Sequence, residues 1–165
     1  MGARAQVITI IKIEECTVIP FFVVHRQWAE GTDMLLEVLD IVSFVYSHRG
    51  YFSMEYLQDT YMKKFSKKFH MLNDDVFLTN DLINRFFDAE MWRSFDNDVG
   101  FAKLVIDMKK DGAFTGQLQL MNHDFTPITI DMWRDTFSYY DKNNDSNAFY
   151  SGFKSLMRWY EIDIS

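Results

Sequence analysis

The sequence predicts an α+β protein, mainly helical, that forms a single domain over residues 1–165 and contains two β-hairpins. Three observations support this fold class. The length of 165 residues suits one domain. A content of 48% hydrophobic and 25% charged residues is typical of globular proteins. Apolar residues recur with helical spacing in some segments and gather in short β-branched runs in others.

The first expected element is a β-hairpin over residues 6–24. Residues 6–13 and 17–24 are rich in β-branched and aromatic residues, and the polar residues 14–16 separate them. Pro20 places the second strand at a sheet edge or a bulge, because proline donates no ladder hydrogen bond. A spanning helix needs about 20 residues nearly free of charge. Charges in the middle of this stretch therefore predict a soluble protein without a membrane segment.

Helices follow from apolar spacing and capping residues. In the first of them, Leu35, Val38 and Val42 share one face behind the N-cap signal at Thr32. A second hairpin is expected over residues 101–121, with a turn marked by Asp111 and Gly112. The expected helices cover residues 33–49, 53–69, 80–92, 130–140 and 148–161.

The order of elements over residues 33–121 resembles a winged-helix domain. In this resemblance residues 109–112 are the wing and helix 80–92 takes the recognition position, while residues 129–161 add a C-terminal helix–loop–helix. The resemblance implies a nucleic-acid-binding regulator. The candidate binding patch, for phosphate or an acidic partner, consists of the lysines of the second helix and of the wing: Lys63, Lys64, Lys67, Lys68, Lys109 and Lys110.

The charge distribution disfavours nucleic acid as the partner. The chain has a formal charge of −7, and residues 71–100 carry seven acidic side chains against Arg85 and Arg93. A helix that reads DNA needs cations for the phosphate backbone. The lysine cluster also has a simpler interpretation, because a solvated helix face is usually charged. Protein binding is therefore favoured over DNA binding even if the topology is that of a winged helix.

A third alternative is a degenerate calcium-binding protein. Asp141, Asn143 and Asp145 place oxygen ligands at alternate positions between two helices, which resembles an EF-hand loop. Gly152 stands where that loop needs its bidentate glutamate, so we expect an Asx-rich turn without calcium, and no cofactor. Cys16 is the one cysteine, which excludes an intrachain disulfide and favours a reducing, cytoplasmic location.

No motif in the sequence points to catalysis. There is no glycine-rich phosphate loop, nucleophile elbow or paired histidine spacing. The chain does carry 16 Phe, 8 Tyr and 4 Trp, more aromatic surface than a small core readily buries. Aromatic side chains are enriched in protein interfaces. The sequence therefore predicts a non-enzymatic protein that binds another protein, as a subunit of an assembly or as a modulator.

Overall fold

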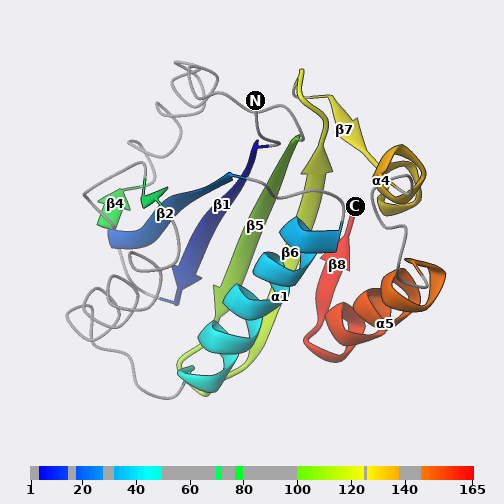
Figure 1. Ribbon diagram of the computed structural model, residues 1–165. Helices are drawn as coiled ribbons and strands as arrows, with labels where there is room; N and C mark the ends of the chain where they lie inside the picture. The colour runs from blue at the N-terminus through cyan, green and yellow to red at the C-terminus, as the bar shows by residue number, and fades with distance from the viewer. Residues whose placement is uncertain are drawn as a thin grey trace.

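The computed structural model describes residues 4–14, 18–27, 32–49, 70–71, 77–79, 100–124, 126–137 and 146–165. Within these ranges the strands form one mixed sheet, and α1 and α5 lie on the same face of it (Figure 1). The chain is thus an α+β protein. The elements in order are β1 (Arg4–Ile13), β2 (Val18–Gln27), α1 (Thr32–Ser47), β3 (His70–Met71), β4 (Phe77–Thr79), β5 (Gly100–Met108), β6 (Phe114–Met121), β7 (Pro127–Ile128), α4 (Ile130–Phe137), α5 (Ser146–Trp159) and β8 (Ile162–Ile164).

The sheet is built around the parallel pair β1 and β5. Its main path runs β3-β2-β1-β5-β6-β7, while β4 also pairs with β2 and β8 also pairs with β6. β2 pairs antiparallel with β1, and β6 pairs antiparallel with β5. At the centre Ile11 of β1 lies opposite Ile106 of β5. β8 and β6 form a second parallel pair, in which Ile162 lies opposite Gly116.

The core lies between the sheet and its covering helices. Alternate residues of β5, Ala102, Leu104 and Ile106, are fully buried on the helix side. The other face of the sheet also holds buried side chains, because Ile8 of β1 and Phe101 of β5 are inaccessible too. The helices contribute residues spaced at three or four positions: Leu35, Val38, Ile41, Val42 and Val45 from α1, Trp133 from α4, and Tyr150, Phe153 and Met157 from α5.

Gly100 allows α4 to approach the sheet closely. It has a φ of +134°, a region that L side chains rarely adopt. A Cβ atom there would collide with the Met121 carbonyl oxygen and lie 2.9 Å from Cζ3 of Trp133. The missing side chain therefore leaves the space that the fully buried Trp133 ring fills.

Several expected elements are present in the structure. The helices expected at 33–49, 130–140 and 148–161 correspond to α1, α4 and α5, and the hairpins expected at 6–24 and 101–121 correspond to β1–β2 and β5–β6. The helices expected at 53–69 and 80–92 lie outside the described residues. The single-domain assignment stays a prediction.

The structure does not confirm a mainly helical protein with a winged-helix-like core over residues 33–121. In that expectation the 101–121 hairpin carries the wing, residues 109–112, and is separate from the N-terminal hairpin over residues 6–24. In the structure β5 instead pairs in parallel with β1, so the two expected hairpins belong to one sheet. Strand β8 was not expected. Among the described residues, no helix combines the length and apolar character needed to cross a membrane.

Candidate binding surface

Two of the predicted site residues, Lys109 and Lys110, are exposed in the turn between β5 and β6. The turn is closed by a hydrogen bond of 2.9 Å from the Lys109 amide to the Ala113 carbonyl. The Lys110 amide donates a further bond of 2.9 Å to the Glu14 carboxylate. This contact ties the turn to the end of β1, so the wing of the winged-helix prediction is anchored to the sheet.

The remaining predicted site residues lie outside the described parts of the chain. They are the lysines Lys63, Lys64, Lys67 and Lys68 and the weak metal candidates Asp141, Asn143 and Asp145. In the ranges that the structure does describe, no three His, Cys, Asp or Glu residues gather so that they could hold a metal ion.

An aromatic cluster forms where the C-terminal ends of α1 and α5 converge. The ring centroid of Tyr46 lies 5.4 Å from that of Trp159 and 5.1 Å from that of Tyr160. Tyr46 also forms a T-shaped pair with Phe114 of β6, with ring centroids 5.4 Å apart. The guanidinium carbon of Arg49 lies 3.7 Å from the centre of the Tyr46 ring, a cation–π geometry. Tyr46 is thus held from several sides and in turn supports Trp159.

Each of the two helices carries an apolar stripe that leads to this cluster. Residues with spacing i, i+3, i+7 and i+10 share one helix flank. The large apolar members of the two stripes, here called the α1–α5 stripe, are Leu36, Leu39 and Tyr46 of α1 and Phe149, Leu156 and Trp159 of α5. The positions between them hold Ser43 and Gly152, so neither stripe contains a charge.

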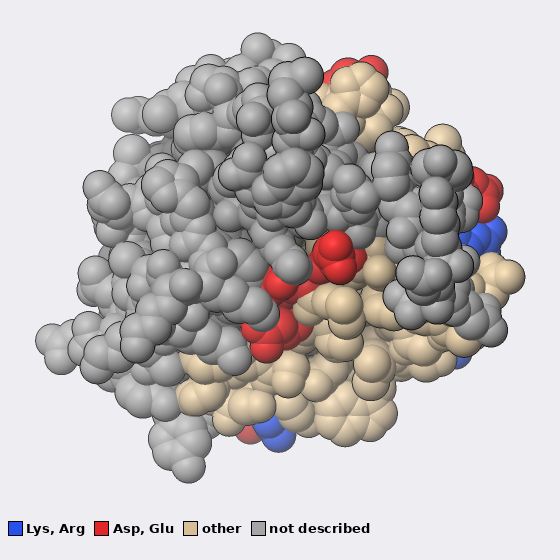
Figure 2. All heavy atoms as spheres, viewed as in Figure 1, with Lys and Arg blue, Asp and Glu red and all other residues tan. Residues whose placement is uncertain are grey.

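Part of the α1–α5 stripe is exposed to solvent. Trp159 is 65% exposed, Leu36 is 46% exposed and Leu156 is 42% exposed. Figure 2 shows this face of the molecule, where acidic atoms lie over the upper part of α1 and the described surface over the lower part of α1 and α5 is largely uncharged. Large apolar side chains that lie together mark an interaction site more often than scattered ones do.

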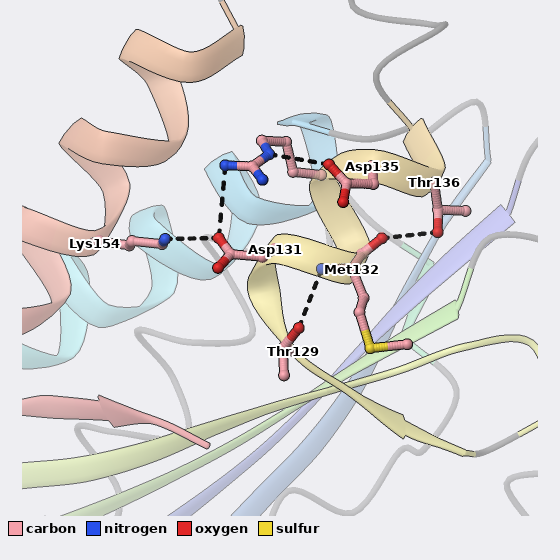
Figure 3. A network of polar contacts seen from close by, with 7 residues as sticks. Thr129, Asp131, Met132, Asp135, Thr136 and Lys154 are labelled. Atoms are coloured by element: carbon pink, nitrogen blue, oxygen red, sulfur yellow. Dashed lines mark hydrogen bonds and ion pairs between the residues drawn. The ribbon is translucent and has the colours of Figure 1, made fainter.

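The opposite flank of α5 is polar and is joined to α4 (Figure 3). The Lys154 ammonium donates a hydrogen bond of 2.8 Å to the carboxylate of Asp131, in the first turn of α4. This hydrogen bond is the main reason that the pKa of Asp131 lies below its ordinary value. Arg134 approaches the same carboxylate at 3.6 Å. The hydroxyl of Thr129 caps α4 by accepting a bond of 3.1 Å from the Met132 amide.

A cavity of about 280 Å³ opens beside the last strand on this polar flank. We call it the β8 groove, and its lining residues are Ile130, Lys154, Arg158, Ile162, Asp163 and Ile164. Arg158 is exposed and forms no ion pair with another described residue. The groove therefore combines an apolar wall, a strand edge and a basic side chain.

A smaller cavity of about 120 Å³ lies against β5 and β6, lined by Lys103, Val105, Gln117, Gln119 and Ser165. Lys103 and Gln119 face each other across the two strands. They alternate with the core residues and so belong to the face of the sheet opposite α1. Partial burial, and secondarily the charge of Lys12, lowers the pKa of the Lys103 ammonium.

The exposure of one residue, Leu156, could not be predicted from the apolar pattern of the sequence. Leu156 fits the apolar stripe of residues 148–161 together with Phe153 and Met157, yet the latter two are buried and Leu156 is not. Neighbouring positions on a helix differ by about 100°, so a wide apolar face does not show which of its edges meets solvent. The apolar face of this segment is wide, and this width was the one sequence feature which indicated that the core does not cover all of the apolar surface of α5.

No protein-family model, no curated protein and no solved structure significantly matches this chain.

Proposed function

We propose that this protein is non-enzymatic and binds another protein through the α1–α5 stripe, as a subunit of an assembly or as a modulator of its partner. The observation that carries the proposal is Trp159. Its ring is 65% exposed, and it contacts Tyr46 and, at a centroid distance of 4.9 Å, Tyr160. An exposed tryptophan that is already oriented loses little side-chain entropy when a partner covers it.

The surroundings of Trp159 resemble those of an interface hot spot. Such residues are often Trp, Tyr or Arg, and they sit within apolar contacts that exclude water. Leu156 lies one turn away from Trp159 on the same helix. Tyr46, which contacts Trp159, also forms the cation–π contact with Arg49. The described surface over the lower part of α1 and α5 is largely uncharged, so a partner there would desolvate few charges.

Trp159→Ala tests this proposal, with Met132→Ala as the matched control. Met132 is 53% exposed on α4 and lies outside the α1–α5 stripe. Immobilised wild-type and variant proteins are incubated with extract from the native source, and retained proteins are quantified by mass spectrometry. We expect a partner that wild type and Met132→Ala retain equally. Trp159→Ala should weaken its binding by about 2 kcal/mol or more, which is about thirtyfold.

The outcome is informative only for folded variants, so circular dichroism spectra of all three proteins must agree. Identical sets of retained proteins for wild type and Trp159→Ala would remove the α1–α5 stripe as the binding surface.

The second candidate is the nucleic-acid-binding regulator that the winged-helix resemblance implies. The exposure of Lys109 and Lys110 in the β5–β6 turn favours it. Such a protein should bind duplex DNA with an affinity that falls steeply as salt rises. Replacement of both lysines by Gln should then weaken binding and reduce the slope of that salt dependence. A protein binder that uses the α1–α5 stripe should show neither effect.

A further inference from the structure

We propose that the protein forms a two-fold symmetric dimer in which the α1–α5 stripe of one copy packs against the α1–α5 stripe of the other. This inference rests on the proposed function, because it names a second copy of the chain as the protein that the stripe binds. Two independent properties of this face support a second copy. Its two margins carry opposite charges, and its large and small side chains follow opposite orders in the two helices.

The two helices that carry the stripe have charges of opposite sign. α1 contains the acidic residues Asp33, Glu37 and Asp40 and no basic residue, whereas α5 contains Lys154 and Arg158 and no acidic residue. Asp33 and Asp40 are partly exposed, and acidic atoms are seen over the upper part of α1 in Figure 2. Arg158 is exposed on α5. The face therefore joins an acidic helix to a basic one.

These charges lie at the outer margins of the face. Successive residues of a helix differ in direction by about 100°. On this spacing Asp40 lies on one side of the exposed Leu36, and Tyr46, which contacts α5, lies on the other side. On α5, Arg158 follows the polar flank that faces away from α1, next to the exposed Trp159. The uncharged stripe is thus bordered by acidic side chains on α1 and by basic ones on α5.

Two-fold symmetry can bring the margins of opposite sign together. Both copies use the same patch in such a pair. When the two-fold axis runs along the helices, the α1 margin of each copy faces the α5 margin of the other, so Asp40 lies on the side of the partner's Arg158. An axis across the helices would place the two acidic margins together, which complementary recognition disfavours. The formal charge of −7 repels the copies at long range, but physiological salt screens this repulsion beyond about 8 Å.

The sizes of the side chains are complementary in the same arrangement. α1 and α5 pack against each other and run in the same direction (Figure 1). Along α1 the large Leu36 comes first and the small Ser43 and Ser47 follow, whereas along α5 the small Gly152 precedes the large Trp159. With the axis along the helices, Trp159 of each copy lies over the serine end of α1 in the other, and Leu36 lies toward the partner's Gly152. Large side chains that fill gaps beside small ones give close packing.

The first test is sedimentation equilibrium of the full chain over a series of protein concentrations. We expect reversible dimerisation of the wild type, with an average mass that rises toward twice that of the monomer. Trp159→Ala should weaken dimerisation by about a hundredfold or more, because the side chain enters the contact twice. Met132→Ala, outside the stripe, should dimerise as the wild type does.

Charge reversal at the margins tests the arrangement of the two copies. Asp40→Lys and Arg158→Glu should each weaken dimerisation by about tenfold or more, because each brings like charges together at two places. Lys109→Glu makes the same change of charge on the β5–β6 turn and should have no effect. An equimolar mixture of the two margin variants should dimerise about as tightly as the wild type, since the introduced cation of one faces the introduced anion of the other. A misfolded variant would not recover on mixing.

The proposal is overturned if the wild type is monomeric at every concentration, or if Trp159→Ala leaves a dimer unchanged. Failure of the mixed margin variants to dimerise would overturn it too, because opposite margins would then not meet. The proposed function fails by a different result, in which Trp159→Ala retains every protein from the extract that the wild type retains. A monomeric chain that loses an extract protein in Trp159→Ala would assign the α1–α5 stripe to a different partner.

Discussion

At the scale of single residues, Thr9 stands out in the core. It is fully buried on β1, on the same face as Val7 and Ile11, and its hydroxyl oxygen has no hydrogen-bond partner within the described part of the chain. A buried hydroxyl without a partner costs free energy that an apolar group of the same shape does not. We expect Thr9→Val to raise the free energy of unfolding by about 1 kcal/mol in urea denaturation. Thr9→Ser, which keeps the hydroxyl and removes the methyl group, should lower it.

A loss of stability in Thr9→Val would mean that the hydroxyl makes a favourable contact, and would contradict this account of the core.

At the scale of the elements, the Asp131–Lys154 pair joins α4 to α5. In the folded protein, this hydrogen bond lowers the pKa of Asp131 below its ordinary value of 3.8. A carboxyl group with a lowered folded pKa stabilises the fold above its unfolded pKa, and this contribution disappears as pH falls through the folded value. We expect Lys154→Gln to raise the pKa of Asp131 toward 3.8 in an NMR titration. The free energy of unfolding of this variant should therefore fall less steeply than that of the wild type as the pH decreases through the acidic range.

Asp124 is the internal control, because hydrogen bonds from Thr126 lower its pKa and Lys154 does not contribute. An equal change at both carboxyl groups would show a general effect of charge in place of a specific link between the helices.

The elements also show what the sequence could predict. Helices α1 and α5 were predictable because their buried residues, such as Leu35, Val38 and Met157, repeat at helical spacing and depend on local signals. The pairing of β1 with β5 was not, since no local pattern distinguishes a parallel partner far along the chain from an independent hairpin. β8 has only three residues, too few for a strand pattern. The β8 groove and the exposure of Leu156 could therefore not be predicted from the sequence.

At the scale of the whole molecule, the fold depends on contacts between distant parts of the chain. β1 and β5 are joined along nine residue pairs, and the Glu14–Lys110 bond beside them spans 96 positions. The entropy of closing such a long loop must be lost before the central pair contributes any stabilisation. Proteins with many distant contacts accordingly fold in milliseconds to seconds, whereas helical bundles fold in microseconds to milliseconds.

We therefore expect stopped-flow refolding of the chain in the slower range, with formation of the β1–β5 pair in the rate-limiting step. Ile106→Val, which removes one buried methylene opposite Ile11, should slow folding. Ile41→Val removes the same group from α1 and should mainly speed unfolding, because α1 can form by local contacts at any stage. If Ile41→Val slowed folding and Ile106→Val did not, α1 would precede the sheet in the transition state. The central strand pair would then be a late product of folding.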